Sequence, residues 1–208
     1  MKTWDEIWGA YEPDFLARRL KRGQAETLAK IVNKIKLPKD SKIIDVGCGS
    51  GSILAMFRNL GYSDSIGIDV SQNALELCNQ LFGFEKGKDT FLMDARSVQF
   101  PDNSFDLLFS DGMLEHFERP PTDIVGEFCR LSREWILLFQ PNQTSLFGRI
   151  KWLWQAAGRA SWEKEYHYSK LDYINMLTKF GGSLTDSGGF NLSEFMYLLF
   201  SKERPFTK

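Results

Sequence analysis

The feature that most constrains the fold is a regular alternation of short apolar runs and helical segments between residues 42 and 140. The apolar runs are continuous, as in strands that are buried on both faces of a parallel sheet. Helices between such strands cover the two faces. The pattern therefore predicts an α/β fold with a doubly wound, mostly parallel sheet. Strands are expected at 42–46, 65–70, 90–94, 105–111 and 135–140, and helices at 14–36, 53–60, 73–82 and 122–131.

A glycine-rich loop joins the first predicted strand to the helix that follows it. It reads Asp45-Val-Gly47-Cys-Gly49-Ser-Gly51. Glycines allow a tight turn and let the backbone approach a ligand closely. The crevice at the carboxyl ends of parallel strands is the usual ligand site of such a sheet. The loop therefore marks a candidate binding site, although a loop of this kind alone also fits a purely structural turn.

Polar residues end three further predicted strands at the same edge of the sheet. Asp69 ends the second strand, where a carboxylate can accept both hydroxyls of a ribose. Asp94 ends the third strand, where a carboxylate could accept from an adenine amino group. Ser110 and Asp111 end the fourth strand. Chance placement at four consecutive strands is improbable, so we infer a site for a nucleoside-containing ligand.

Two kinds of nucleotide ligand compete for this site. An NAD-binding loop has the pattern GxGxxG, and the position of its third glycine holds Ser52. An acid two residues before the first glycine, here Asp45, is also unusual for NAD. Tyr166 and Lys170 have the Tyr-x-x-x-Lys spacing of some oxidoreductases, but they lie too late in the chain. A P-loop is excluded because no Gly-Lys-Ser/Thr occurs. An NAD(P)-dependent oxidoreductase remains the first alternative.

These segments together resemble class I S-adenosylmethionine-dependent methyltransferases. The resemblance rests on IIDVGCGSGSIL, GIDVS, MDA and FDLLFSDGMLEHF and covers roughly residues 41–142. It is greatest to the small-molecule type (methyltransferase domain 11-like), in which the segment after strand four ends in LEH. The family has a Rossmann-like sheet of seven strands with the last one antiparallel. Two late strand candidates, near 183–187 and 195–201, would complete that number.

The resemblance implies a role for each polar residue at the strand ends. The glycine loop would pack against the methionine part of S-adenosylmethionine, and Asp45 would hold its amino group. Asp69 would take the ribose hydroxyls, beside Val70 at the adenine. Asp94 would accept from the adenine amino group, near the backbone of Ala95. The implied cofactor-binding residues are Asp45, Gly47, Gly49, Gly51, Asp69, Val70, Asp94, Ala95, Ser110 and Asp111, of which the last two would face the reacting methyl group.

The implied reaction is transfer of the cofactor's methyl group to a small-molecule acceptor by in-line displacement. A protonated acceptor atom also needs a general base, and two histidines are the candidates. His116 lies just beyond the fourth strand, and His167 lies where the family often has a His or Tyr facing the acceptor. Tyr166 and Tyr168 are candidates similar to His167, and Glu115 is a weaker one. A purely structural role is the alternative for each of these candidate bases. The sequence has no cluster of metal ligands that would suggest a metal site.

The division of the chain follows from the same resemblance. We expect a single methyltransferase domain over 1–208, because no linker or repeat divides it. The tryptophans and basic residues after 142 suit a lid, a helix packed on the domain, or a segment at a membrane surface. The expected parts are an N-terminal helical cap (1–40), a cofactor-binding core (41–142), a lid-like insert (143–168) and a C-terminal helix with strands (169–208).

Composition limits the partners. Twenty-six basic and 27 acidic residues give a net charge of -1, which argues against a broad nucleic-acid-binding face. The [ND]PP[YF] motif of amino-directed DNA methyltransferases is also missing, since SDGM stands in its place. A small-molecule acceptor is therefore the main hypothesis, and a membrane or lipid acceptor is a minor one. A non-catalytic partner protein that keeps the fold is the second alternative.

The compartment is expected to be the cytoplasm. Three cysteines without a CxxC pair are typical of buried residues in a reducing compartment. The first residues carry acids where a signal peptide needs an apolar run. No stretch approaches the length of apolar sequence that a membrane-spanning helix needs.

Overall fold

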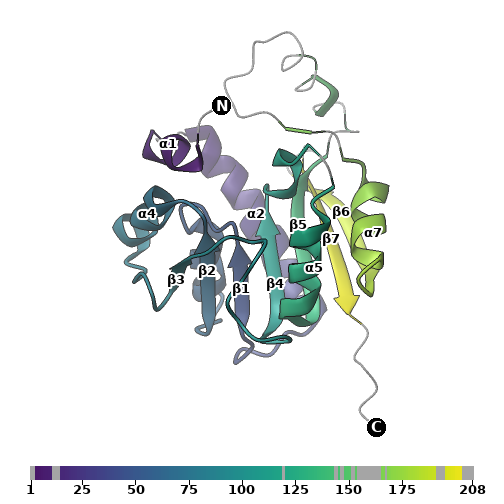
Figure 1. Cartoon of the computed structure of the whole chain (residues 1–208), viewed down its shortest axis with the longest axis horizontal. Coiled ribbons are helices and arrows are strands. Elements are labelled where there is room, and N and C mark those ends of the chain that lie inside the picture. The colour runs from purple at the N-terminus through teal and green to yellow at the C-terminus, as the bar shows by residue number, and fades with distance from the viewer. Residues whose placement is uncertain are drawn as a thin grey trace.

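The computed structural model describes the larger part of the chain and centres on one sheet. The described residues are 3–10, 15–118, 120–142, 145, 148–150, 153, 165–166, 168–190 and 195–202. Their seven strands have the order β3-β2-β1-β4-β5-β7-β6 (Figure 1). The strands are β1 (Ile43–Val46), β2 (Ser65–Asp69), β3 (Thr90–Leu92), β4 (Phe105–Asp111), β5 (Ser132–Pro141), β6 (Gly182–Phe190) and β7 (Phe195–Lys202).

Strand directions confirm the predicted fold class. β1, β2, β3, β4 and β5 pair in parallel, and β7 runs antiparallel to both β5 and β6. From β1 the chain proceeds outward to β3 and then returns to place β4 on the other side of β1. The order therefore reverses between β1 and β4. Ligands of doubly wound sheets bind at this switch point, beside the carboxyl ends of the strands.

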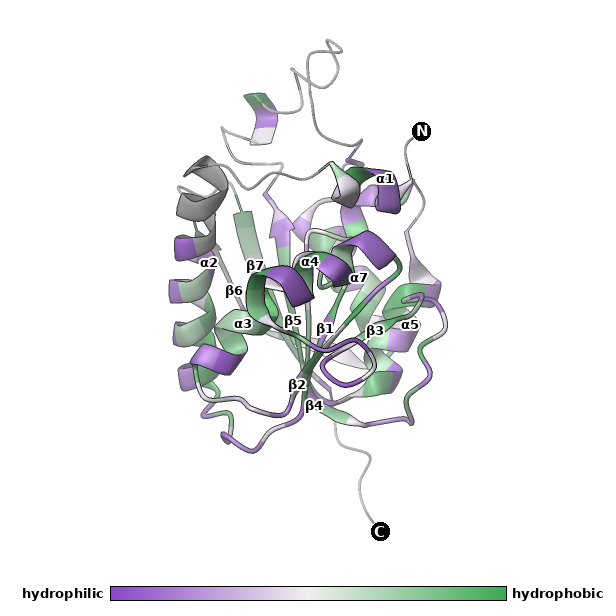
Figure 2. Cartoon of the chain, turned by 90° about the vertical axis from the view of Figure 1, so that its left-hand side faces the viewer, coloured by the Kyte–Doolittle hydropathy of each residue, from purple (hydrophilic) through white to green (hydrophobic). Residues whose placement is uncertain are grey.

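Helices cover both faces of the sheet, as predicted. Ile44 and Val46 of β1 contact the cluster formed with α5 and α7, whereas Ile43 contacts the cluster formed with α2 and α3. Successive strand residues point to opposite faces, which explains the unbroken apolar runs. Figure 2 shows hydrophobic residues concentrated in the strands. The helices are α1 (Trp4–Gly9), α2 (Phe15–Lys34), α3 (Ser52–Asn59), α4 (Gln72–Phe82), α5 (Thr122–Leu131) and α7 (Lys170–Thr178), with a 3₁₀ turn η1 (Leu114–His116).

Local signals set most helix ends, with small differences from expectation. Ser71 caps α4, and its hydroxyl accepts from the Ala74 N–H. α5 starts at Thr122, directly after Pro121, whose side chain makes no cap hydrogen bond. The last helix ends at Thr178, and Gly182 already pairs with β7. β5 begins three residues before the predicted 135, since Ser132 pairs with β4.

The N-terminal helix α1 was not predicted as an element of its own. A capping box starts it: Thr3 Oγ1 accepts from the Glu6 N–H, and the Glu6 carboxylate accepts from the Thr3 N–H. α1 lies over α4, across the end of the sheet toward which the parallel strands run (Figure 1). Within the part of the chain that the structure describes, no helix is long and apolar enough to cross a membrane. The three cysteines are free and buried.

Candidate active site

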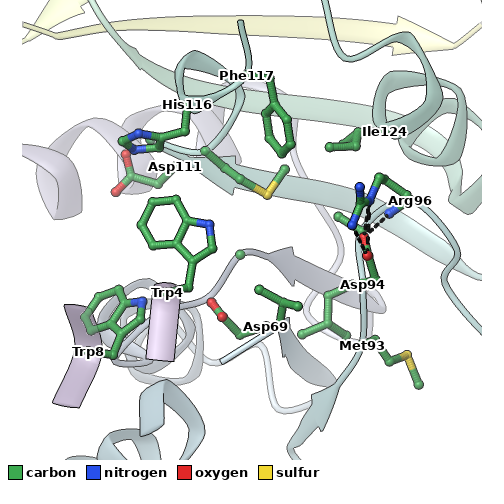
Figure 3. A pocket seen from close by; sticks show the side chains of 16 residues that line it. Trp4, Trp8, Asp69, Met93, Asp94, Arg96, Asp111, His116, Phe117 and Ile124 are labelled. Atoms are coloured by element: carbon green, nitrogen blue, oxygen red, sulfur yellow. Dashed lines mark hydrogen bonds and ion pairs between the residues drawn. The ribbon is translucent and has the colours of Figure 1, made fainter. Parts of the chain in front are cut away.

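A cavity of about 250 Å³ opens at the carboxyl ends of the parallel strands (Figure 3). Its wall comes from α1, the glycine loop, the ends of β2 and β4, the segment after β3, and η1. Seven of the predicted site residues therefore meet although they are far apart in the sequence. The lining residues are Trp4, Trp8, Gly47, Ile68, Asp69, Val70, Met93, Asp94, Ala95, Arg96, Asp111, Gly112, Met113, His116, Phe117 and Ile124.

A second cavity of about 140 Å³ adjoins the first on the glycine-loop side. Trp8, Gly47 and Asp111 line both cavities, so these residues mark the place where the two meet. A ligand with two unlike halves fits such a pair of cavities. The residues around the smaller cavity are Trp8, Gln24, Asp45, Gly47, Cys48, Gly49, Ser50, Ser52, Ile53 and Asp111.

The glycine loop has a backbone that only glycine adopts easily. Gly47, Gly49 and Gly51 all have positive φ angles, of 75°, 51° and 77°. The N–H groups of Gly47 and Cys48 donate to Ile68 O at 2.9 and 3.0 Å, which ties the loop to β2. A Cβ at Gly49 would lie 2.4 Å from the Trp8 ring. The Trp8 ring thus occupies the space beside Gly49 that a side chain would need.

Asp69 is held at the end of β2 by two backbone groups. Its Oδ2 accepts from the Gly49 N–H and its Oδ1 from the Ser71 N–H, both at 2.9 Å. Burial raises the pKa of Asp69, and the two N–H donors oppose part of that rise. Each carboxylate oxygen has a second lone pair, so the side chain can accept further hydrogen bonds from a ligand in the larger cavity.

Asp45 is a buried carboxyl group in the wall of the smaller cavity. Its side chain is nearly inaccessible, and its Oδ2 has no hydrogen-bond partner among the described residues. Burial raises the pKa of Asp45 well above its usual range, and the negative charges of Asp111 and Asp69 raise it further. A buried carboxylate in this situation is costly unless a cation approaches it. The site is therefore suited to a positively charged group.

Asp94 lies in the larger cavity, but Arg96 already binds it. Arg96 Nε donates to Asp94 Oδ1 at 3.0 Å and Nη2 donates to Oδ2 at 2.6 Å. The Arg96 guanidinium lowers the pKa of Asp94, which stays ionised. Ala95 lines the same wall between the two. The sequence analysis did not single out Arg96, although its spacing of two residues from Asp94 was visible.

Asp111 and Ser110 are placed differently, although they are neighbours in β4. Asp111 lines both cavities, and its Oδ2 accepts from Gln24 Nε2 at 2.6 Å. Ser110 is fully buried, and its hydroxyl donates to Val46 O at 2.9 Å across the β1–β4 pair. The structure thus does not bring the Ser110 side chain together with the others. Gln24 is a buried residue of the site that the sequence analysis missed.

His116 lies in the wall of the larger cavity, next to Trp4. The two rings meet edge to face, with 4.8 Å between their centroids. Near His116, the Tyr166 backbone N–H donates to the Glu115 backbone O, and the Tyr168 hydroxyl donates to Phe117 O, both at 2.7 Å. His167 lies outside the described residues, as do the tryptophans at 152, 154 and 162 of the predicted lid.

Comparisons with known proteins agree with this geometry. Residues 44–134 match the family model described as methyltransferase domain. The structure resembles that of a magnesium protoporphyrin IX methyltransferase from Synechocystis PCC 6803 with bound S-adenosylhomocysteine, at a TM-score of 0.70 and 17% identity over 96% of this chain and 93% of the other. A methyltransferase structure from Thermotoga maritima gives a TM-score of 0.73 at 15% identity, over 96% and 98%. Residues 44–134 thus form a methyltransferase domain, consistent with the class I S-adenosylmethionine-dependent type.

Curated relatives of this methyltransferase act on unlike acceptors. A phosphoethanolamine N-methyltransferase of Plasmodium falciparum (isolate 3D7) is 30% identical over 179 residues, or 84% of this chain and 62% of its own length. The tRNA (carboxymethyluridine(34)-5-O)-methyltransferase alkbh8 of Xenopus tropicalis is 29% identical over 76% of this chain and 21% of its own length. The chain thus spans less than two thirds of either relative. The comparisons support the methyltransferase class over an NAD(P)-dependent oxidoreductase.

The residues present fit S-adenosylmethionine, the cofactor of the family. Its adenosine half carries the hydroxyl and amino donors that Asp69 and Asp94 can accept from in the larger cavity. Its methionine half carries an ammonium, for which the partnerless Oδ2 of Asp45 is suited in the smaller cavity. Among the described residues, no cluster of three or more His, Cys, Asp and Glu could hold a metal ion.

Replacing Asp69 with Ala is expected to weaken S-adenosylhomocysteine binding by about 100-fold or more. Two hydrogen bonds to a charged acceptor are lost, each worth about 1.5–3 kcal/mol. Isothermal titration calorimetry measures the effect. Asp89→Ala is the matched control, since Asp89 also accepts from a backbone N–H but lies outside both cavities. Equal affinities for wild type and Asp69→Ala would contradict the assignment.

Proposed function

We propose that this chain transfers the methyl group of S-adenosylmethionine to a small-molecule acceptor that enters beside Asp111 and His116. The observation that carries the proposal is the buried carboxyl group of Asp45, whose Oδ2 has no partner among the described residues, in a cavity that shares lining residues with the site around Asp69. A ligand with a positive charge and a nucleoside half would neutralise Asp45 and would also fit the site around Asp69. The cosubstrate supplies an electrophilic methyl group on a sulfonium.

The residues of the chain act mainly by binding and orientation. Asp45 and the glycine loop hold one end of the ligand, and Asp69 with Asp94 holds the other. Gln24 fixes the Asp111 carboxylate at the junction of the cavities. Holding two reactants in line at near-attack distance can supply about 7–11 kcal/mol of the barrier reduction. α1 places Trp4 and Trp8 in the wall of the site.

Two observations support a small-molecule acceptor. A relative that matches 84% of this chain and 62% of its own length is named for phosphoethanolamine, a small amine. The near-zero net charge, -1, provides no broad attraction for a tRNA. A screen with radiolabelled methyl donor tests the proposal, with small amines and phenols in one arm and tRNA and protein extracts in the other. Labelling confined to the macromolecular arm would contradict the small-molecule acceptor.

The cofactor is tested first by calorimetric titration with S-adenosylmethionine, S-adenosylhomocysteine and NAD⁺, starting from cofactor-stripped protein. We expect saturable micromolar binding of the first two and no binding of NAD⁺. NAD⁺ binding alone would overturn the proposed function. Cofactor binding without turnover on any acceptor would favour the non-catalytic partner protein instead.

His116 is proposed as the general base toward the acceptor. Replacing His116 with Ala is expected to lower kcat by about 100- to 10,000-fold, because proton removal in the transition state is lost, while cofactor affinity is retained. The acidic limb of the kcat pH profile should disappear with it. If His116 only supports the Trp4 ring, the variant should keep its turnover and its pH profile and lose thermal stability instead.

A further inference from the structure

The helix α1 contributes two tryptophans to the wall of the site, and they occupy different places. Trp4 lines only the larger cavity and contacts His116. Trp8 lines both cavities, together with Gly47 and Asp111. Figure 3 shows the Trp4 indole among the other labelled side chains and the Trp8 indole to one side, next to α1. Trp8 is thus the aromatic residue at the junction between the two cavities.

The Trp8 ring packs directly on the glycine loop. A Cβ on Gly49 would lie 2.4 Å from Trp8 Cζ2 and 2.6 Å from Cη2, so the ring takes the space that a side chain would fill. The ring is half-buried. Asp45 and Asp111 line the smaller cavity with it. The Trp8 indole and two carboxylates thus line the same small cavity.

A set of hydrogen bonds holds α1 in this position. Asp5 Oδ1 accepts from the Ser71 hydroxyl at 2.7 Å and from the Asn73 N–H at 3.0 Å. Asn73 Nδ2 donates to Asp5 O at 2.8 Å. The Asn73 N–H and the Ser71 hydroxyl hold the pKa of Asp5 below its usual range, so the anchor stays ionised. Ser71 also donates its N–H to Asp69, which links the α1 anchor to the predicted ribose site.

The proposed function places a specific group at the junction. S-adenosylmethionine carries its sulfonium between the adenosine and methionine halves. If adenosine lies with Asp69 and the methionine ammonium with Asp45, the sulfonium lies where the two cavities meet. That place is lined by Trp8. An aromatic face attracts a cation most strongly when the aromatic ring is an indole.

We propose that Trp8 recognises the positive charge of the cofactor sulfonium and thereby makes the site prefer S-adenosylmethionine to its neutral product, S-adenosylhomocysteine. This inference rests on the proposed function. In this proposal Trp8 of α1 determines which ligand the site prefers. Asp5 holds α1 in place and so positions Trp8. Preference for the charged ligand helps the product to leave after each turnover.

Calorimetric titration of the full chain with both ligands at one pH tests the inference. The two ligands differ by the methyl group and its positive charge, so the ratio of their affinities reports on the charge. We expect Trp8→Leu to lower the S-adenosylmethionine preference by about 2- to 30-fold, the range of a cation–π contact from exposed to desolvated sites. Trp8→Phe keeps an aromatic face and should retain most of the ratio.

Trp4→Leu is the matched control, because it removes an indole from the same helix and the same larger cavity. It should leave the affinity ratio unchanged even where it weakens both ligands. Equal losses for both ligands in Trp8→Leu, or an equal fall of the ratio in Trp4→Leu, would overturn the inference. Failure of the wild-type chain to bind either ligand would instead contradict the proposed function. Thermal denaturation confirms that each variant is folded.

Discussion

Replacing Asp45 with Asn is expected to abolish most of the cofactor affinity and at the same time to stabilise the protein. Asp45 is a buried carboxyl group whose Oδ2 has no partner among the described residues. Loss of the partner of a buried charge pair costs about 2–5 kcal/mol, so S-adenosylmethionine should bind about 30- to 5,000-fold more weakly. An amide has nearly the same shape, so the effect arises from the lost charge.

The gain in stability follows from the direction of the Asp45 pKa. Burial, Asp111 and Asp69 raise this pKa in the folded state above its value in the unfolded chain. For an acid, that shift destabilises the folded state increasingly as the pH rises from the unfolded pKa to the folded one. Asn cannot ionise and removes the effect. A substitution of this kind commonly raises the free energy of unfolding by about 0.5–2 kcal/mol. For a chain of this length, that gain raises Tm by about 1–8 °C.

Titration calorimetry and thermal denaturation at neutral pH measure the two effects together. Asp106→Asn is the matched control, because Asp106 accepts from the Lys42 N–H and from Arg133 outside both cavities. It should keep full cofactor affinity and gain no stability. Wild-type affinity should also weaken as the pH falls through the raised pKa. A destabilised Asp45→Asn variant with unchanged affinity would show that Asp45 supports the fold and not the ligand.

Replacing Gly49 with Val is expected to remove measurable cofactor binding. Gly49 has a φ of 51°, and a Cβ there would lie 2.4 Å from the Trp8 ring. Either the loop or α1 must move, and both line the smaller cavity. The left-handed backbone adds about 1–2 kcal/mol of strain for a residue with a side chain. Binding of S-adenosylhomocysteine by calorimetry is the measurement.

Gly83→Val separates the effect of backbone strain from the effect of a collision with Trp8. Gly83 has a φ of 72°, but nothing lies within 4 Å of a Cβ built on it. The variant therefore carries the same kind of backbone strain at the end of α4 without a collision. It should lose stability and keep its cofactor affinity. Normal binding by Gly49→Val would place the cofactor away from the glycine loop.

A chain of hydrogen bonds links the anchor of α1 to the site. Asp5 contacts Ser71, Ser71 contacts Asp69, and Asp69 contacts the N–H of Gly49. Trp8, which also belongs to α1, lies next to Gly49. A ligand that binds Asp69 and the glycine loop therefore also stabilises the groups that hold α1.

The sheet and the glycine loop could be predicted because their signals are local. Continuous apolar runs such as Ile43–Val46 report burial on both faces, and that property depends only on neighbouring residues. The loop required glycine at 47, 49 and 51 because positive φ angles exclude most other residues there. The antiparallel last strand came from the family resemblance, and the pairing of β7 with β5 and β6 confirms it.

Side-chain direction at a strand end could not be predicted from position alone. Ser110 and Asp111 are adjacent at the end of β4, but Ser110 donates to Val46 O inside the sheet, whereas Asp111 lines the cavities. Successive residues of a strand point to opposite sides, and which one meets the ligand depends on the register with β1. The proposed cofactor contacts of the other site residues stay predictions until a ligand is bound.

The sequence by itself determined the fold class, the order of the strands' polar ends and the place of the loop, because periodicity and backbone conformation are encoded within a few residues. Only the tertiary structure brought Gln24 to Asp111, 87 residues away, and Asp5 to Ser71, 66 residues away. Such contacts have no local signal. Trp4 and Trp8 stand four residues apart, which places them on one face of a helix, but the cavity beneath that face exists only once α1 lies over α4.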